Sequence, residues 1–343
     1  MDAPAGGCSA PSALSAHASP DAVAHQALAG GDQGFRHVAA LARSADHLRA
    51  LAVPFVQEGL RAGDLTVLAC APSTAARIGA VLGEHASGLV SDARLGLLGT
   101  RAPDALAEIR SLARRAADSG SGRLRVLAEV QVTSTERDRR EGVRYEAASN
   151  AVLASAPITG LCLYDGSRLP SGSEAEMRAT HPLLVEDGGV RRNDHYRDPR
   201  AFVGSLPLPR DPVEAAAPVL VVDDARSLPD LRHALAAVVD TWVRDPEQQA
   251  DLRLGLAEVA ANAFRHGSRP VSARVWVEPG RMVCTVSDQG NRPVDPLAGF
   301  VPAHGDDLSR GGMGLWLARK LFDNVDLVSG PAGLTVRLAT HLR

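Results

Sequence analysis

A proline-rich stretch between two differently patterned halves is the feature that most constrains the fold of this chain. Residues 205–218 read SLPLPRDPVEAAAP, with repeated prolines and no apolar period, which is typical of a semi-rigid linker. A chain of 343 residues exceeds the usual size of one hydrophobic core, so length alone indicates two domains. We therefore expect a disordered tail at 1–33, a first domain at 34–204, the linker, and a second domain at 219–343.

Before the linker, helical stretches alternate with short apolar strands. Helices are predicted at 53–62 (ending at Gly63), 74–82, 102–117 and 142–154, and strands at 65–71, 124–130 and 158–164. This alternation favours an α/β domain with a wound, parallel sheet and helices on both faces. Ligands of such sheets usually lie at the carboxyl ends of the strands, where Glu129 and Asp165 occur.

After the linker the pattern changes to long helices and strand pairs. A short strand is predicted at 219–222, helices at 228–243, 247–265 and 314–322, and strand pairs at 273–278 with 282–287 and at 325–329 with 334–342. The expected architecture is an α+β domain whose helices cover one face of a mainly antiparallel sheet.

Charge and lysine content exclude some functions. The formal net charge of -3 gives no global reason to expect nucleic acid or an anionic membrane as a partner. Lys320 is the only lysine of the chain, so a Walker A phosphate loop, which needs its own lysine after a glycine-rich turn, is excluded.

The cysteines and the N-terminus indicate a cytoplasmic protein. Cys8, Cys70, Cys162 and Cys284 lie far apart in the sequence, and we interpret them as free thiols in a reducing compartment rather than as disulfides or a zinc site. The first 30 residues lack the basic start and compact apolar block of a signal peptide, and no apolar run reaches the length of a membrane span.

A series of polar residues and glycines in the second half carries the chemistry. Glu258, Asn262 and His266 follow one another at steps of four, which places them on one face of a helix. Taken alone, this pattern is equally typical of a solvated helix face. The motif Asp288-Gln-Gly290 then ends a strand, and a long loop at 291–310 leads to a glycine-rich helix start.

Each of these elements suits a nucleotide. An aspartate at a strand end can accept a hydrogen bond from the exocyclic amine of adenine, and Gly290 lets the backbone approach the base. Glycines at a helix start expose N–H groups that bind phosphates. Asn262 offers a neutral oxygen suited to Mg²⁺, and Glu258 can deprotonate an attacking hydroxyl. A loop as long as 291–310 favours a functional lid.

The order E-x-x-x-N-A-x-x-H-G, D-x-G, long loop and G-G-x-G-L resembles the N, G1 and G2 boxes of GHKL ATPases, and most closely those of anti-sigma-factor serine-protein kinases of the RsbW type. The resemblance implies a Bergerat ATP-binding sandwich with ATP and Mg²⁺ as cofactors and Glu258 as catalytic base. It implies an ATP site, with Asn262 also binding Mg²⁺, made of Asn262, His266, Asp288, Gly290, Arg310, Gly311, Gly312, Gly314 and Leu315. Arg232 resembles the arginine that contacts a sigma factor, or is an ordinary surface charge. The chain departs from the family where Asn291-Arg292-Pro293 replaces a common glycine, which bears on the lid hinge.

The first domain resembles the MEDS sensory domain. The matching stretches are GFRH (34–37), VPFVQEGLRAGD (53–64), RYEAASN (144–150), LYDG (163–166) and THPLLVEDG (180–188). The resemblance implies a RecA-like wound sheet without its nucleotide loop. His37, Glu146, Asp165 and His181 are its candidate sensory-ligand residues, although polar groups with a purely structural role are an alternative.

Together these resemblances imply a cytoplasmic regulator that binds ATP, sequesters a sigma factor and phosphorylates a serine or threonine of a STAS-type anti-sigma antagonist, while its first domain senses a signal. A homodimer is expected, and neither nucleic acid nor membrane is an expected partner. One alternative is a nucleotide-binding anti-sigma module without kinase activity. Another is a sensor histidine kinase, but its nearest candidate histidines, His47 and His233, lack the acidic residue that usually follows.

Overall fold

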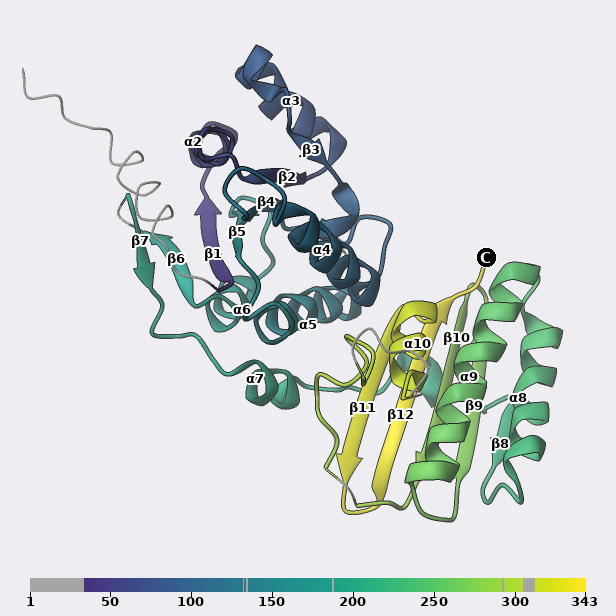
Figure 1. The fold of residues 1–343 in the computed structure, drawn as a ribbon. Helices are drawn as coiled ribbons and strands as arrows, with labels where there is room; N and C mark the ends of the chain where they lie inside the picture. The colour runs from purple at the N-terminus through teal and green to yellow at the C-terminus, as the bar shows by residue number, and fades with distance from the viewer. Residues whose placement is uncertain (1–33, 132, 134, 187, 292, 305–311) are drawn as a thin grey trace, which may run out of the picture.

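The computed structural model describes residues 34–131, 133, 135–186, 188–291, 293–304 and 312–343. The tail at 1–33, with Cys8, lies outside the described residues, as do the candidate phosphate-binding residues Arg310 and Gly311. The described chain forms two domains, drawn in purple to teal and in green to yellow (Figure 1). Each domain is built around its own sheet.

The N-terminal domain contains a seven-stranded sheet in the order β3-β2-β4-β5-β1-β6-β7. Its strands are β1 (Arg36–Ala42), β2 (Leu65–Ala69), β3 (Val90–Ser91), β4 (Leu124–Glu129), β5 (Ile158–Asp165), β6 (Leu183–Glu186) and β7 (Gly189–Arg192). All neighbouring pairs are parallel except β6 and β7, so the sheet is mixed. The predicted α/β class is confirmed, whereas a RecA-like identity of the sheet stays a prediction.

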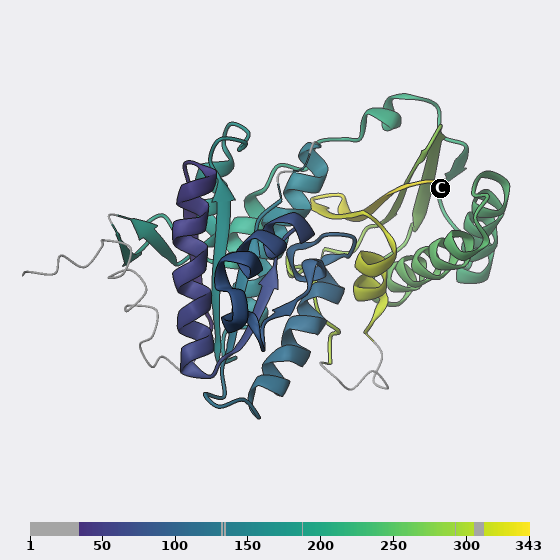
Figure 2. The same cartoon turned by 90° about the horizontal axis from the view of Figure 1, so that it is seen from above.

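Helices cover both faces of this sheet. They are α2 (Ala45–Ala62), α3 (Pro72–Leu82), α4 (Ala102–Ala116), α5 (Glu136–Val152), α6 (Ser173–Thr180) and α7 (Pro199–Ser205). Residues of α2 and α3 share one buried apolar cluster with the sheet, and residues of α4 and α5 share another. Figure 2 shows α2 on the outer side and α4 on the side that faces the C-terminal domain. None of the helices in the described part of the chain is both long and apolar enough to span a bilayer.

Two helices begin earlier than the sequence pattern predicts because each has a side-chain cap. The side chain of Ser44 accepts a hydrogen bond from His47 N, which starts α2 about two turns before the predicted position and leaves Pro54 inside the helix. Thr135 caps α5 in the same way through Asp138 N. The predicted end of α2 is confirmed, because Gly63 adopts the left-handed conformation that suits a glycine C-cap.

The C-terminal domain is an antiparallel sheet with helices on one face, as predicted. The strand order is β11-β12-β10-β9-β8, with strands β8 (Leu220–Val222), β9 (Ser272–Glu278), β10 (Arg281–Asp288), β11 (Asn324–Gly330) and β12 (Gly333–His341). Helices α8 (Leu228–Trp242), α9 (Pro246–His266) and α10 (Gly314–Leu321) share one buried apolar cluster with this sheet.

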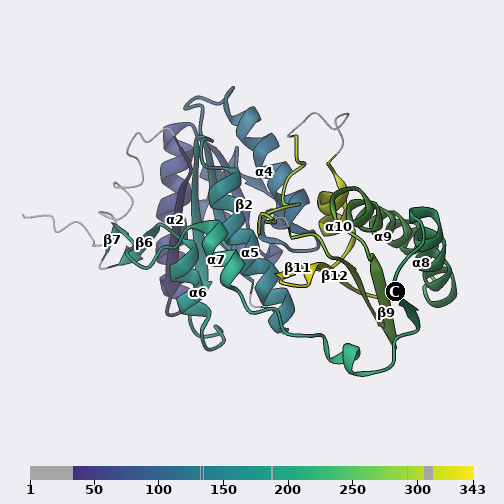
Figure 3. The same ribbon diagram turned by 90° about the horizontal axis from the view of Figure 1, so that it is seen from below.

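The segment predicted as a linker lies along the other face of the C-terminal sheet (Figure 3). Its short helix η3 (Pro212–Ala215) places Val213 in a small buried cluster with Trp276, Val283 and Ala339. The buried carboxylate of Asp211 pairs with Arg137 of the N-terminal domain at 2.7 Å and with Arg281 of β10 at 3.0 Å. The segment is thus tied to both domains.

A buried carboxylate joins the two domains. Asp326 of β11 pairs with Arg144 at 2.8 Å and with Arg140 at 3.4 Å, both from α5, and with Arg337 of β12 at 3.3 Å. All four side chains are at most 10% exposed. Because buried charges are tolerated only when they are paired, this network fixes α5 against β11.

Further contacts surround the Asp326 network. Arg101, at the start of α4, donates to Phe322 O at 2.9 Å and pairs with Asp323. Lys320 of α10 pairs with Asp104 of α4 at 2.8 Å. Phe300, from the loop after β10, is buried in the apolar cluster of α4 and α5. The two domains therefore share both charged and apolar contacts.

We predict that Asp326→Asn destabilises the docked protein by about 3–5 kcal/mol, because it leaves buried arginines without their counter-charge. Chemical unfolding followed by tryptophan fluorescence and circular dichroism measures this loss. The matched control is Asp223→Asn in the same domain, whose ion pair with Arg274 has a carboxylate that is 77% exposed. The control should change the free energy of unfolding by at most about 1 kcal/mol. Equal effects of the two substitutions would contradict the importance of the Asp326 network.

The same network predicts a dependence on acid. Burial raises the pKa of Asp326, but the arginines, led by Arg144, lower it by more, so that its pKa in the folded protein lies below the ordinary value. Asp326 therefore makes its full contribution to the free energy of unfolding above the ordinary aspartate pKa of about 3.9. This contribution is lost as the pH falls through the lower pKa of the folded state. Unfolding free energies measured between pH 6 and the acid limit should show this loss in the wild type and a smaller one in Asp326→Asn.

Candidate active site

Helix α9 presents the three polar residues that the sequence singled out. Asp245 caps the helix by accepting a hydrogen bond from Gln248 N at 2.7 Å, and Pro246 occupies its first turn. Its buried face packs on the sheet through the apolar residues Leu252, Leu256, Val259 and Ala263. Glu258 and Asn262 lie half-buried at the edge of this face, and His266 is exposed in the last turn.

Asp288 lies buried at the end of β10, and its surroundings hold its carboxylate in one position. Oδ1 accepts hydrogen bonds from Ser268 N at 3.3 Å and from Gly290 N at 2.7 Å. A Cβ atom at Gly267 would lie 2.2 Å from Asp288 Cγ, so only glycine allows the end of α9 to come this close. Neither hydrogen bond uses Oδ2, which can therefore accept a hydrogen bond from a ligand amine.

The start of α10 contacts α9 at Asn262. A Cβ atom at Gly314 would lie 2.5 Å from Asn262 Nδ2, so the first residue of α10 touches the amide of Asn262. Just before it, Gly312 has a φ of 73°, which favours glycine. Leu315 is half-buried in the first turn. The N-terminus of α10 therefore directs its N–H groups and the positive end of its dipole toward the neighbourhood of Asn262.

The structure thus brings most of the predicted nucleotide residues into one region. Asn262 and Gly314 are in contact, and Asp288 and Gly290 lie together at the end of β10 next to Gly267. The glycines allow the backbone to pack directly against Asn262 and Asp288, where any larger side chain would clash. Gly267 ends the motif E-x-x-x-N-A-x-x-H-G, and Gly333 lies in the turn between the predicted strands 325–329 and 334–342, but their contacts with Asp288 were not predicted. A Cβ at Gly333 would lie 1.9 Å from Asp288 O.

Arg232, the candidate sigma contact, is an exposed residue of α8. Its guanidinium approaches Ala257 O of α9 at 3.4 Å, one residue before Glu258. The exposed position leaves this arginine accessible to a protein partner. The candidate phosphoacceptor histidine His233, next to it, is exposed as well.

Comparisons with known proteins agree with this geometry. Residues 221–340 match the histidine kinase-like ATPase domain, and residues 36–182 match MEDS, the methanogen/methylotroph DcmR sensory domain. A serine-protein kinase RsbW of Bacillus licheniformis is 33% identical over 124 residues, which make up 33% of this chain and 76% of that protein. The chain belongs to the RsbW family of serine-protein kinases.

Other members of the RsbW family show the same degree of similarity. The RsbW of Bacillus subtilis is 29% identical over 123 residues, 33% of this chain and 76% of that protein. The RsbW of Bacillus velezensis is 33% identical over 103 residues, 27% of this chain and 64% of that protein. The chain thus spans slightly less than two thirds of the velezensis protein.

In the N-terminal domain of this RsbW-family chain, three of the four candidate sensory residues meet. His37 Nε2 lies 3.2 Å and His181 Nε2 3.6 Å from Glu146 Oε2. Asp165 does not join them, because its carboxylate accepts hydrogen bonds from the backbone and hydroxyl of Ser167 at the end of β5. The cluster lies against the face of the sheet rather than at the carboxyl ends of its strands.

Cys162 is a fourth member of this cluster, and sequence reasoning missed it. Its Sγ lies 3.4 Å from His37 Nε2 and 3.7 Å from Glu146 Oε2. Cys70, Cys162 and Cys284 are free and buried, as predicted. The sequence offered no spacing signal for Cys162, because its neighbours come from residues 125 and 16 positions away.

A cavity of about 540 Å³ lies between the two domains. Its walls include members of the cluster and aromatic residues of both domains, among them Glu146, Cys162, Tyr164, Phe300 and Phe322. This volume is in the range of small-molecule sites. The C-terminal end of α10 forms part of the wall through Arg319. Burial lowers the pKa of Arg319 to about 10.

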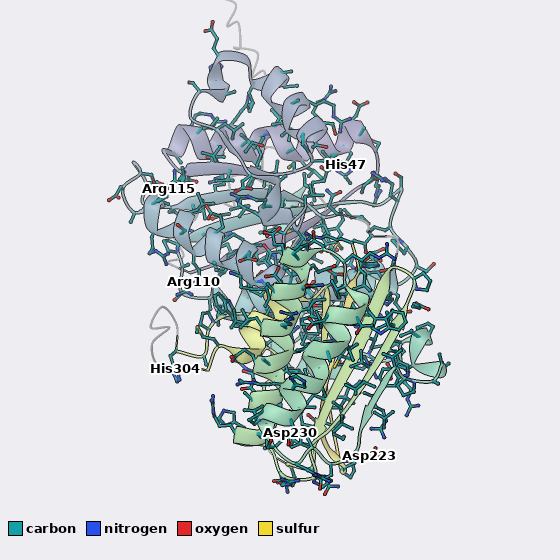
Figure 4. The ribbon with its side chains drawn as sticks, turned by 90° about the vertical axis from the view of Figure 1, so that its right-hand side faces the viewer. His47, Arg110, Arg115, Asp223, Asp230 and His304 are labelled. Atoms are coloured by element: carbon teal, nitrogen blue, oxygen red, sulfur yellow. The ribbon has the colours of Figure 1, made fainter. Side chains whose placement is uncertain are left out.

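The first part of the predicted lid is held at this interface. Leu297 and Phe300 are buried, Arg319 Nε donates to Ala298 O at 2.8 Å, and Arg200 pairs with Asp295 at 3.1 Å. In Figure 4, His304, where the described part of this loop ends, lies on the same side of the molecule as Arg110 of α4. The N-terminal domain thus contacts the base of the loop.

We predict that Gly314→Ala weakens ATP binding, because the new methyl group displaces the amide of Asn262. The loss of one contact to a charged ligand corresponds to a rise in Kd of about 10- to 100-fold. Isothermal titration with Mg-ATP measures it. The control is Gly330→Ala at the end of β11, where a Cβ meets nothing within 4 Å. An unchanged Kd in Gly314→Ala would mean that the start of α10 does not bind the nucleotide.

Proposed function

We propose that this protein is an ATP-dependent anti-sigma regulatory factor that sequesters a sigma factor and phosphorylates a serine or threonine of a STAS-type anti-sigma antagonist. The contact between Asn262 and Gly314, with Glu258 one helical turn before Asn262, carries the proposal. This contact brings the start of α10 to the amide of Asn262, one turn from Glu258, and so supports a site in which these groups bind phosphate, bind Mg²⁺ and accept a proton, respectively. The similar Bacillus proteins are serine-protein kinases by name, which supports the same reaction class.

In the proposed phosphoryl transfer, each residue of the site has a separate role. ATP supplies the phosphoryl group, and Mg²⁺ offsets its charge. Asp288 Oδ2 accepts a hydrogen bond from the adenine amine, while Gly290 keeps the backbone close to the base. Asn262 would bind Mg²⁺ through its side-chain oxygen, and His266, Gly312, Gly314 and Leu315 would contact the phosphates. Arg310 and Gly311, which lie outside the described residues, keep their predicted phosphate-binding role. Glu258 accepts the proton of the attacking hydroxyl as its oxygen bonds to phosphorus and ADP leaves.

The partner surface of this proposal lies beside the nucleotide site. Arg232 is exposed on α8 and its guanidinium lies against α9, so a sigma factor that contacts Arg232 sits next to Glu258. Competition between sigma factor and antagonist for neighbouring surfaces then provides partner switching. A homodimer and a cytoplasmic location remain predictions from the resemblance.

The N-terminal domain is the proposed sensor. Its candidate ligand residues His37, Glu146 and His181 meet beside a cavity that both domains enclose, and Asp165 lies apart from them. The same domain contacts α10 through Asp104 and the base of the loop after β10 through Arg200. A ligand in the cavity can therefore alter the position of elements that bind ATP. A RecA-like origin of the sensory sheet also remains a prediction.

We predict that Glu258→Gln lowers phosphate transfer to the antagonist by about 100- to 10,000-fold, the usual contribution of a general base. The substitution keeps the shape of the side chain, so ATP affinity should not change. Transfer from radiolabelled ATP to the cognate antagonist measures the rate, and titration measures the affinity. Glu247→Gln, at an exposed position of the first turn of α9, is the control and should behave as wild type.

Three results would count against this assignment, the first against the role of Glu258 and the other two against the kinase proposal itself. Equal transfer by Glu258→Gln and wild type would refute the role of Glu258. Tight sigma-factor binding without transfer to any antagonist would instead support a nucleotide-binding module that only shapes the sigma-factor interface. Acid-labile phosphate on the protein itself, after incubation with ATP alone, would indicate a histidine kinase.

A further inference from the structure

Four potential metal ligands converge in the N-terminal domain from four separate elements. They are His37 of β1, Glu146 of α5, Cys162 of β5 and His181 at the end of α6, and one ligand atom from each lies within 4.8 Å of the others. All four residues are at most 9% exposed. In the described structure, the ion-pair partners of Glu146 are the two histidines. The cluster therefore holds its carboxylate without an arginine or a lysine.

The proton on His181 is fixed by its backbone contact. Nδ1 lies 2.9 Å from Met177 O, and a carbonyl oxygen can only accept a hydrogen bond. The Thr180 hydroxyl also lies 3.0 Å from Nδ1, but it has its own acceptor in Glu176 O at 2.9 Å. A proton on Nδ1 therefore satisfies both carbonyl oxygens, and Nε2 of the neutral ring then presents a lone pair. This Nε2 is buried, has no hydrogen-bond partner among the described residues, and faces Glu146.

Asn150 fixes the proton on His37 in the same way. Its Nδ2 donates to Thr180 O at 2.7 Å and to Glu146 O at 3.1 Å, which orients Oδ1 toward His37 Nδ1 at 3.1 Å. Oδ1 is an acceptor, so His37 Nδ1 donates and Nε2 presents its lone pair to the cluster. Each histidine thus has the outer-shell partner that orients metal-binding histidines in proteins.

Three acceptor atoms, Nε2 of each histidine and the carboxylate oxygen of Glu146, therefore face one another and the Cys162 thiol in a buried position. The two imidazole nitrogens and the carboxylate oxygen repel one another, and the single Cys162 proton can serve only one of them. A cation between the lone pairs would offset this repulsion and give each of these buried groups a partner.

The spacing of the four atoms matches a metal ion. Tetrahedral Zn²⁺ with bonds of about 2.0–2.3 Å places its ligand atoms roughly 3.3–3.8 Å apart. Four of the six separations between these atoms, of which two involve the Cys162 sulfur, are 3.2, 3.4, 3.6 and 3.7 Å, and the other two are at most 4.8 Å. We propose that His37, Glu146, Cys162 and His181 bind one Zn²⁺ ion in the N-terminal domain.

The proposed site borders the cavity between the domains. His37, Glu146 and Cys162 line that cavity, whereas His181 lies outside its lining. Imidazole, thiolate and carboxylate together suit Zn²⁺, and binding releases the Cys162 proton to solvent. The site goes beyond the proposed function, because it assigns an inorganic ligand to the sensory half and does not depend on kinase activity.

The test uses the full chain, freed of metal with a chelator under reducing conditions. Titration with Zn²⁺ and elemental analysis should give one ion per chain, and Co²⁺ as a probe should give tetrahedral visible bands with a thiolate-to-cobalt charge-transfer band. Cys162→Ser should remove the charge-transfer band. Asn150→Ala should weaken binding by about 10- to 100-fold, as is usual for an outer-shell residue.

The control keeps Cys162 as the sole thiol. Cys8→Ser, Cys70→Ser and Cys284→Ser combined should bind Co²⁺ with the wild-type spectrum, because the proposed site uses Cys162 alone; Cys70 and Cys284 are not part of the cluster, and Cys8 lies outside the described residues. Circular dichroism verifies that each variant is folded. A folded wild type that binds no Zn²⁺ would overturn the proposal, and so would a charge-transfer band that persists in Cys162→Ser. If Cys162→Ser does not fold, the variant that keeps only Cys162 tests the proposal instead. A folded form of this variant without the thiolate-to-cobalt charge-transfer band would refute the site.

Discussion

The rest of the structure depends on the buried carboxylate of Asp326. Its negative charge balances the positive charges of arginines from α5 and β12, which could not be buried without it. The N-terminal domain therefore packs against the C-terminal domain around Asp326. Helix α5 connects this contact with the sensory half of the protein. Arg144 pairs with Asp326, and Glu146, two residues later, belongs to the buried histidine and cysteine cluster. A displacement of α5 therefore alters the cluster and the domain interface together.

Helix α10 makes a second connection between the halves. Its first residue touches Asn262, and its later residues Arg319 and Lys320 contact the loop after β10 and helix α4. Eight residues of α-helix extend only about 12 Å. A packed helix of this length moves as a unit. One end of α10 belongs to the candidate nucleotide site and the other end lines the interdomain cavity, so this single helix connects the two.

The sequence predicted those parts of the molecule that depend on local patterns. The four-residue spacing of Glu258 and Asn262 gave the right helix face, and the glycines at 312 and 314 marked the start of α10 because few other residues fit there. Helix α2 was predicted too short, since the pattern ignored Ser44 as a cap and took Pro54 as a start signal. The linker was predicted to be a spacer, but Asp211 and Val213 find partners far away in sequence. The Asp326 network and Cys162 were not predictable for the same reason, because pairs 125 to 186 residues apart leave no periodic trace.

The interdomain cavity has walls from both domains, and this shared construction has a thermodynamic consequence. The cavity is complete only while the domains are docked, so a compound that fills it binds the docked form better than the undocked one. By reciprocity, whatever favours docking raises the affinity for that compound by the same factor, and a partner protein that separates the domains expels it. Occupancy of the cavity and attachment of the two halves are then two measures of a single equilibrium.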